Sequence, residues 1–196
     1  MSRTFFLIGI IIFLVVGFSS IFIIDETEQA VVTQFGKPVG GAITDAGIHF
    51  KTPLIQTVIK FDKRILEWDG SANEIPTKDN KYIFIDTFAR WSISNPLQFY
   101  KSARNEMLAQ SRLDDIIDGA VRDEISNRFM SEIVRSTDRE MGVYDSDIEG
   151  GSDEVIKEGA RKSIIESILL SVESKLNELN IGISIVDFQI KRMSYN

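Results

Sequence analysis

The first feature of the hydrophobic pattern is an unbroken apolar run close to the N-terminus. Residues 4–24 contain no ionisable side chain, and sixteen of these twenty-one residues are Phe, Leu, Ile or Val. A helix of this length spans about 31 Å, which matches the hydrocarbon core of a bilayer. The run is longer than the apolar region of a signal peptide and no A-x-A cleavage site follows it. The pattern predicts an uncleaved transmembrane signal anchor at 4–24, with a cleaved signal peptide or a buried core helix as alternatives.

The charges that flank this run predict its orientation. Arg3 and the α-amino group precede it, whereas Asp25, Glu26 and Glu28 follow it. Because the positively charged end of a span stays in the cytoplasm, we expect residues 1–3 to be cytoplasmic. The rest of the chain is then extracytoplasmic, which means the periplasm in a bacterium with two membranes, with a single pass through the inner (plasma) membrane.

Short apolar runs separated by turn residues follow the anchor and predict a strand-rich lobe over residues 25–94. These runs are rich in Val, Ile, Thr and Phe and are bounded by Gly, Pro or Asp. The expected strands cover residues 30–35, 47–50, 57–61, 63–69 and 72–77. Gly36-Lys37-Pro38 and Gly40-Gly41 are interpreted as turns.

The longest predicted strand covers residues 81–93 and has apolar side chains on both faces. One face holds Ile83, Ile85, Ala89, Trp91 and Ile93. The other face holds Tyr82, Phe84 and Phe88, together with Asp86 and Arg90. Because a strand that is apolar on both faces is typical of the centre of a sheet, we expect a central strand with layers above and below it.

Asn95-Pro96 can cap and start a helix, and beyond it the apolar period changes from two residues to 3.6, which predicts helices. One amphipathic helix is expected over residues 105–134 and a second over 153–180, with Gly182 as its terminator. A final strand around 186–190 alternates apolar and polar residues. Strands, then helices, then a strand predict an α+β fold, in which residues 95–196 form a second, helical lobe that ends in a strand.

The composition of the chain removes most catalytic chemistries. Its 196 residues include no Cys and a single His, His49. This excludes disulfides, thiolate nucleophiles and metal sites built on paired histidines. The net charge of −7 comes without a basic cluster, so nucleic acid is not expected as a partner.

Two polar features resemble functional sites, and each has a plainer structural interpretation. His49 lies in a short strand without a nucleophile beside it, so we interpret it as a histidine bonded to backbone. The segment DSDIEGGSD, residues 145–153, places Asp145, Asp147 and Glu149 as in a calcium loop. Ile156 stands where such a loop needs a bidentate Glu, so we interpret the segment as a solvated acidic loop.

Several carboxylates share the predicted helix at 105–134 with arginines. They are Asp114, Asp115, Asp118, Asp123 and Glu124, interleaved with Arg112, Arg122 and Arg128. Spacing of four residues favours the pairs Asp118 with Arg122 and Glu124 with Arg128. We interpret this face as a surface for neighbouring subunits and not as a catalytic acid and base. We predict no catalytic, cofactor-binding or metal-binding residue; a Ser with a Lys base is the chemistry left for a hydrolase.

The order of these segments resembles the band-7 (SPFH, stomatin/prohibitin) superfamily over the whole chain. The resemblance rests on EQAVVTQFGKP, GIHFKTPLIQTVIKFDKRI, TKDNKYIFIDTFARWSISNPLQFY, RLDDIIDGAVRDEISN and IVDFQIKRMSY. Residues 77–100 are the most specific part. The resemblance implies an SPFH domain made of a strand-rich lobe and a helix-and-strand lobe behind a membrane anchor.

The resemblance also implies a scaffold and not an enzyme. Members of this kind pair with a homologous subunit, assemble into cages on the membrane, modulate an FtsH-like AAA membrane protease and organise the surrounding lipid. They use no cofactor. The family continues into a long coiled-coil helix, which is absent from this chain as given, so the sequence is either truncated or a short variant. The alternatives from other classes are a membrane-anchored peptidase of Ser/Lys type and an extracytoplasmic ligand sensor, which would need an apolar pocket.

Overall fold

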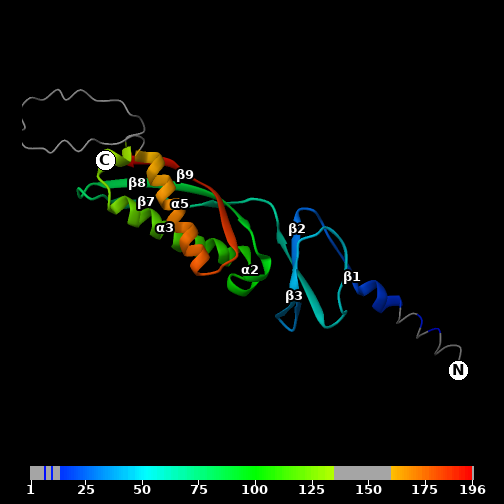
Figure 1. Cartoon of the computed structure of the whole chain (residues 1–196). Coiled ribbons are helices and arrows are strands. Elements are labelled where there is room, and N and C mark those ends of the chain that lie inside the picture. Colours follow the sequence, from blue (N-terminus) through cyan, green and yellow to red (C-terminus); the bar gives the residue numbers. More distant parts are fainter. Residues whose placement is uncertain (1–6, 8–9, 11–13, 135–159, 196) are drawn as a thin grey trace, which may run out of the picture. The chain divides into compact units, whose positions relative to one another are not determined.

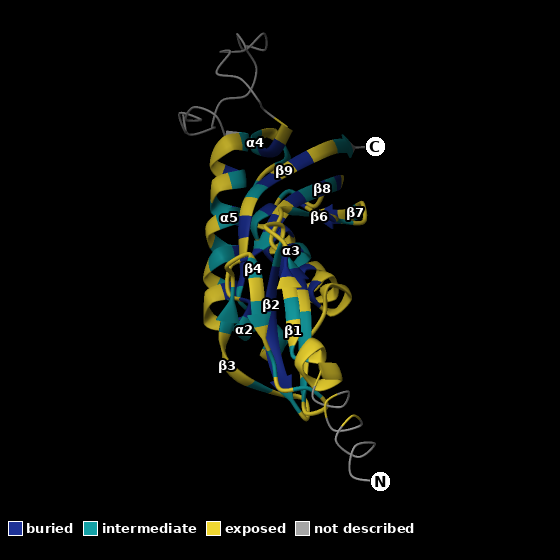
Figure 2. Ribbon diagram, turned by 90° about the vertical axis from the view of Figure 1, so that its right-hand side faces the viewer, coloured by how far each residue is buried: buried dark blue, intermediate teal, exposed yellow. Residues whose placement is uncertain are grey.

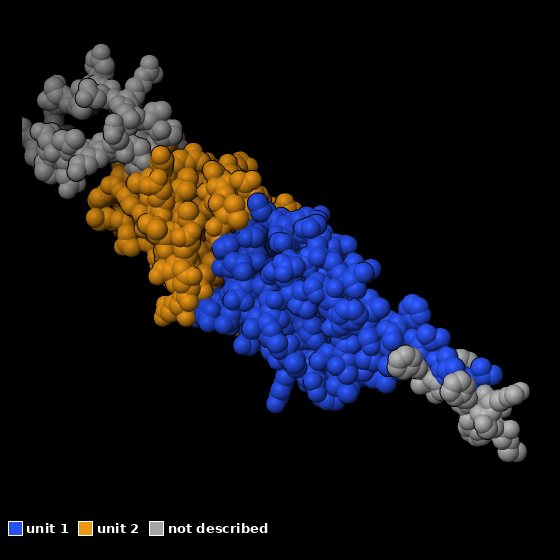
Figure 3. Space-filling model, turned by 45° about the vertical axis from the view of Figure 1, so that its right-hand side comes forward, with its two compact units in different colours: residues 1–66, 91–109, 179–184 blue, residues 67–90, 110–178, 185–196 orange. Residues whose placement is uncertain are grey.

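The computed structural model of the chain describes residues 7, 10, 14–134 and 160–195 (Figure 1). The described residues form two compact units, each built from several stretches of the chain (Figure 3). Unit 1 takes residues from 1–66, 91–109 and 179–184, and unit 2 takes them from 67–90, 110–178 and 185–196. The predicted lobes divide the chain once, after residue 94. The units differ from them because residues 67–90 belong with the helices that come later in the chain.

Unit 1 contains two small antiparallel sheets. In the first sheet, β1 (Ile21–Ile24) pairs with β4 (Gly47–Phe50). In the second, β2 (Glu28–Gln34) lies between β3 (Lys37–Ile43) and β5 (Gln56–Asp62). Strand β2 is the buried centre, since five consecutive residues of it are inaccessible to solvent. The predicted strands in this region are confirmed, and the turn predicted at Gly36 joins β2 to β3. Lys37-Pro38 and Gly40-Gly41, which were also interpreted as turns, belong to β3 and its pairing region with β2.

Helix α2 (Pro96–Ser102) begins where the sequence predicts it. The Oδ1 atom of Asn95 accepts a hydrogen bond from the backbone N–H of Gln98 at 3.1 Å, and Pro96 is the first helical residue. This is a favourable helix start, since the cap satisfies a free N–H and proline has none to lose. The helix buries Phe99, whose ring lies 5.1 Å from that of Phe61 and 6.4 Å from that of Trp91. Aromatic packing therefore fixes α2 in the core of unit 1.

Most residues of the third sheet belong to unit 2. Its strands are β6 (Leu66–Asp69), β7 (Asn73–Pro76), β8 (Tyr82–Ile93) and β9 (Ile183–Tyr195). Strand β8 is central, because β6, β7 and β9 all pair with it. The central position predicted for this strand is confirmed. Together with the helices, the three sheets give an α+β fold, as the sequence predicts.

Three helices accompany this sheet in unit 2: α3 (Glu106–Ser126), α4 (Met130–Val134) and α5 (Ala160–Glu178). The apolar period predicted both long helices correctly. The first is interrupted after Ser126, so it forms α3 and α4 and not one continuous helix. Residues 153–159 of the second predicted helix lie outside the described residues.

The burial of β8 is one-sided, which corrects the prediction of layers on both faces. Alternate residues are buried, namely Ile83, Ile85, Thr87, Ala89, Trp91 and Ile93. On the other face Tyr82 and Phe84 are exposed and Phe88 is half-buried. Trp68 of β6 is buried and bonds α3, so the helices cover the first face. An antiparallel sheet can leave its second face to solvent, and within the described residues this sheet does so.

The end of the apolar N-terminal run is a strand and not a helix. Residues 14–19 are helical, but Ile21–Ile24 form β1, so the helix predicted for 4–24 is wrong over its last four residues. Three isoleucines and a phenylalanine favour an extended backbone that can pair with β4. Residues 4–6, 8–9 and 11–13 of the predicted anchor lie outside the described residues. None of the helices among the described residues has the length and apolar character needed to cross a membrane.

Gly182 ends the turn after α5 in a left-handed conformation that favours glycine. Its φ angle is +81°, and its carbonyl oxygen accepts hydrogen bonds from the backbone N–H groups of Ser94 and Asn95 at 3.0 and 3.1 Å. A β-carbon at this position would lie 2.4 Å from the backbone oxygen of Asn95 and 2.8 Å from the backbone nitrogen of Phe99. The predicted terminator is thus also a close contact between the backbone of this turn and α2.

We expect the substitution Gly182→Ala to lower the free energy of unfolding by about 2 to 4 kcal/mol, since it combines a strained φ angle with a clash against backbone. Urea unfolding followed by tryptophan fluorescence measures the change. Gly41→Ala is the matched control in the same unit, because its β-carbon meets nothing within 4 Å and its φ is not positive. Equal stability of the two variants would contradict the prediction.

Candidate functional site

A group of exposed apolar side chains of unit 1 lies on β1, β4 and the turn after β4. Across the strand pair, Ile21 faces Phe50 and Ile23 faces Ile48, and all four side chains are exposed. Leu54 follows in the turn with a positive φ of 68° and is 99% exposed. Figure 2 shows exposed residues along β1 and β4. These five residues are called the apolar face below.

The apolar face has no charged side chain among its five residues. Soluble monomers rarely expose a contiguous group of large aliphatic and aromatic side chains, so such a patch is typical of membrane or protein contact. The opposite side of the same strand pair is packed: Ile24 is buried, and the ring of Phe22 lies 5.7 Å from that of His49. One side of the strand pair therefore packs against unit 1, and the other side is exposed to solvent.

His49 has the structural surroundings that the sequence predicts. Its Nε2 atom lies 2.9 Å from the backbone oxygen of Asp45, within the loop that leads into β4. The ring contact with Phe22 holds its other side. These contacts agree with a histidine that is bonded to backbone, and they place it beside apolar groups and not beside a nucleophile.

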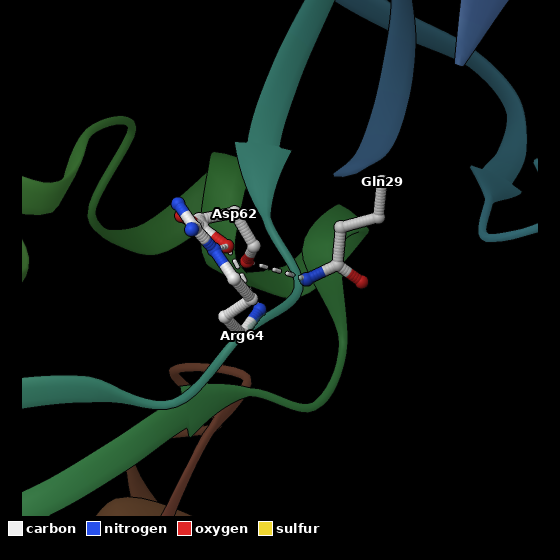
Figure 4. Close-up of polar contacts among 3 residues, drawn as sticks. All are labelled: Gln29, Asp62 and Arg64. Carbon is white, nitrogen blue, oxygen red and sulfur yellow. Dashed lines mark hydrogen bonds and ion pairs between the residues drawn. The ribbon is translucent and has the colours of Figure 1, made fainter. Parts of the chain in front are cut away.

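A buried glutamine joins three strand ends in unit 1 (Figure 4). Gln29 is 2% exposed, and its Nε2 donates to the backbone oxygens of Ile93 at 3.0 Å and Asp62 at 3.3 Å. The Arg64 guanidinium donates to both carboxylate oxygens of Asp62, at 2.7 to 3.2 Å. This hydrogen bonding holds the pKa of the Asp62 carboxyl below its usual range. The sequence did not single out Gln29, because beside Glu28 it has the pattern of a solvated position.

The turn between β7 and β8 is held by one carboxylate. Asp79 Oδ1 accepts hydrogen bonds from Thr77 Oγ1 at 2.8 Å and from the backbone N–H of Met130 at 3.1 Å. Its Oδ2 lies 3.0 Å from Lys81 Nζ. The bonds from Thr77 and Lys81 hold the pKa of Asp79 well below its usual range. These residues therefore fix the turn and the start of α4, which is a structural role.

Two of the predicted carboxylates on α3 point to the sheet of unit 2. Trp68 Nε1 donates to Asp114 Oδ1 at 2.6 Å, and Asn73 Nδ2 donates to Asp118 Oδ2 at 3.2 Å. Burial, and then the charge of Asp114, raise the pKa of Asp118. The interpretation of this helix face as a surface for other subunits is therefore wrong at these two positions. Sequence spacing could not reveal this, since the partners are more than forty residues away in the chain.

The other carboxylates of this group remain on the surface of unit 2. Glu124 forms the predicted pair with Arg128, at 2.5 Å, and Asp123 lies 3.7 Å from Lys175 of α5. Asp118 bonds Asn73 and not Arg122, so that predicted pair is not an ion pair here. Arg122 still lowers the pKa of Asp118 by its charge. The helix thus uses its charges mainly to hold neighbouring elements.

The chemistry that these groups could perform is limited. Among the described residues, no three of His, Asp and Glu gather closely enough to hold a metal ion. Ser20, Ser102 and Ser126 donate to backbone carbonyls one helical turn earlier and do not bond a Lys. The acidic loop with Asp145, Asp147, Glu149 and Asp153 lies outside the described residues.

A comparison with known protein families assigns the chain to one of them. The model of the SPFH domain / Band 7 family matches residues 22–196, which include the strands and helices from β2 to β9 and most of β1. The chain belongs to this family.

Among individual proteins, the chain is similar to several that are named HflC. It is 30% identical to Protein HflC of Treponema pallidum over 96% of this chain and 60% of that protein. It is 34% identical to Protein HflC of Borreliella burgdorferi over 91% of this chain and 57% of that protein. It is 29% identical to the Escherichia coli protein named Modulator of FtsH protease HflC, over 94% of this chain and 62% of that protein. The chain therefore spans about three-fifths of the length of the curated relatives that it matches.

We expect Asp118→Asn to raise the free energy of unfolding at pH 7 by about 0.5 kcal/mol, because it removes repulsion from Asp114 one turn away and keeps an acceptor for Asn73. When folding raises the pKa of an acid, that acid lowers the free energy of unfolding at pH values above its unfolded pKa. The gain should therefore vanish below about pH 4, where the aspartic acid is neutral in both states. Urea unfolding at several pH values measures the difference.

Glu166→Gln is the matched control for this change, since Glu166 is exposed on α5 and the charges that shift the pKa of Asp118 are those of Asp114, Asp115 and Arg122. This variant should keep the stability of the wild type across the same pH range. A loss of stability in Asp118→Asn at pH 7 would mean that the charged hydrogen bond to Asn73 outweighs burial and repulsion, contrary to the prediction.

Proposed function

We propose that the chain is a non-catalytic, HflC-like subunit of a membrane scaffold that modulates an FtsH-like AAA membrane protease. The observation that carries this proposal is the similarity to proteins named HflC over more than nine-tenths of the chain. One of these relatives is named a modulator of FtsH protease. The shared region includes both units, so the proposal concerns the SPFH domain that this chain contains.

A membrane location is supported by two apolar features that are adjacent in the chain. The apolar run at 4–24 carries no ionisable group, and Ile21 and Ile23 of the apolar face belong to the end of that run. We propose a single-pass anchor in the inner (plasma) membrane, with a cytoplasmic N-terminus and the bulk of the chain in the periplasm. The apolar face then contacts lipid next to the anchor, which burial of apolar surface favours. This contact would let an assembly organise the lipid around it.

The proposed partners are an HflK-like homologue, the FtsH-like protease and further copies of such subunits. A scaffold needs no reacting groups, and the polar residues of both units serve structural bonds. Gln29, Asp79 and Asp114 each hold strand or helix ends in place. A peptidase of Ser/Lys type gains no support from the relatives, one of which is named a modulator of FtsH protease.

We expect affinity purification of the tagged chain from native membranes in mild detergent to recover an HflK-like protein and an FtsH-like protease. The complex should run far above the mass of the 22.1 kDa chain. A tagged single-pass membrane protein of unrelated sequence is the control. Recovery of a strictly monomeric chain without either partner would contradict the proposal of a scaffold. Casein hydrolysis by the purified chain, lost on one Ser substitution, would favour the peptidase instead.

The proposed orientation predicts that alkaline phosphatase fused after Asn196 is active, because this enzyme needs an extracytoplasmic location. A cytoplasmic reporter at the same position should be inactive. Fusions after Arg3 provide the control and should give the opposite pair of results, since Arg3 lies before the apolar run. An inactive phosphatase with an active cytoplasmic reporter after Asn196 would reverse the topology.

A further inference from the structure

The face of the unit 2 sheet that the helices leave uncovered carries a row of aromatic side chains. Tyr82, Phe84 and Phe88 lie at positions of the same parity on β8, so they point to the same side. Tyr82 is 58% and Phe84 is 39% exposed. Glu74 and Pro76 of β7 lie directly opposite Phe84 and Tyr82. These three aromatic residues, called the aromatic strip, extend over about 20 Å at the rise of a strand.

Carboxylates surround the aromatic strip and exceed the cations on this face. Lys191 of β9 bonds Asp69 of β6, and its ammonium lies 5.6 Å over the ring of Phe88. The hydrogen bond to Asp69 is the main cause that raises the pKa of Lys191. The charges of Asp69, Asp86 and Glu67 raise this pKa further. One lysine therefore stands among several acids, and the face as a whole is negative.

Two acids on this face form no ion pair. Arg90 is engaged with Asp187 at 2.8 Å, as Lys191 is with Asp69. Glu74 and Asp86 make no ion pair with any residue in the described ranges, although the charge of Asp86 acts on Lys191. Apolar rings beside carboxylates without an ion-pair partner are what a basic amphipathic partner would complement.

We propose that this face binds an amphipathic α-helix of another protein, with its apolar stripe on the aromatic strip and its flanking Lys or Arg side chains on Glu74 and Asp86. Helices already cover the opposite face of the sheet, so a helix is the element that completes a third layer. About 13 helical residues span a strip of about 20 Å.

The charges on this face argue against the other occupants. An anionic bilayer surface attracts basic residues, and Glu74 and Asp86 would be repelled from it. A second copy of this chain carries a net charge of −7 itself. The partner is therefore a basic segment, and this binding surface does not depend on which protein the chain modulates.

The absence of cysteine from the chain allows a direct test by thiol labelling. Pro76→Cys places a thiol beside the aromatic strip without removing an aromatic ring, and Leu170→Cys is the control on the exposed side of α5. Both are labelled with a maleimide in native membranes and as purified full-length chain. If the partner helix occupies this face in about nine-tenths of the chains, labelling at position 76 should be about tenfold slower in membranes than in the purified chain, since only the free fraction reacts. Labelling at position 170 should not change.

Charge reversal then tests the chemistry of the partner. Glu74→Lys with Asp86→Lys, added to the Pro76→Cys chain, should restore fast labelling in membranes. Asp115→Lys with Glu166→Lys alters the net charge equally at exposed positions away from this face and should leave the protection intact. Equal labelling of positions 76 and 170 in membranes overturns the proposal. Protection of position 76 that survives charge reversal would contradict the proposal that the partner is basic. Protection in the purified chain that increases with its concentration would assign the face to a second copy of the chain instead.

Discussion

The alternation of buried and exposed residues along β8 is the constraint on which the rest of the fold depends. Every second residue from Ile83 to Ile93 is buried, and three other strands take their register from this one. A slip of one residue would exchange the buried Trp91 for the charged Arg90. The register therefore cannot shift, and it also determines which aromatic side chains remain on the open face.

The polar residues of the two units are engaged mainly in holding the backbone. Gln29 joins the ends of three strands in unit 1, and Asp79 connects a hairpin turn to the start of α4 in unit 2. Asp114 bonds the indole of a buried tryptophan. These side chains therefore belong to the structural framework of each unit.

The two exposed hydrophobic surfaces differ in their chemistry. The apolar face on β1 and β4 consists of aliphatic side chains and one phenylalanine, which suits the interior of a lipid leaflet. The aromatic strip on β8 is bordered by Glu74 and Asp86, which suits a basic protein segment. This chain of the SPFH domain / Band 7 family therefore carries two exposed hydrophobic surfaces of different composition.

The sequence by itself determined the α+β order of elements, the strand at 81–93, the cap at Asn95, the long helices and the glycine that ends α5, because local periods and turn residues specify them. Only the tertiary structure decided that Ile21–Ile24 pair as a strand, that β8 is covered on one face, and that Asp114 and Asp118 turn to the sheet. These outcomes depend on partners far along the chain, such as Trp68, which is 46 residues from Asp114. A local pattern records which side chains are apolar or charged, but the pairing of distant segments decides what they contact.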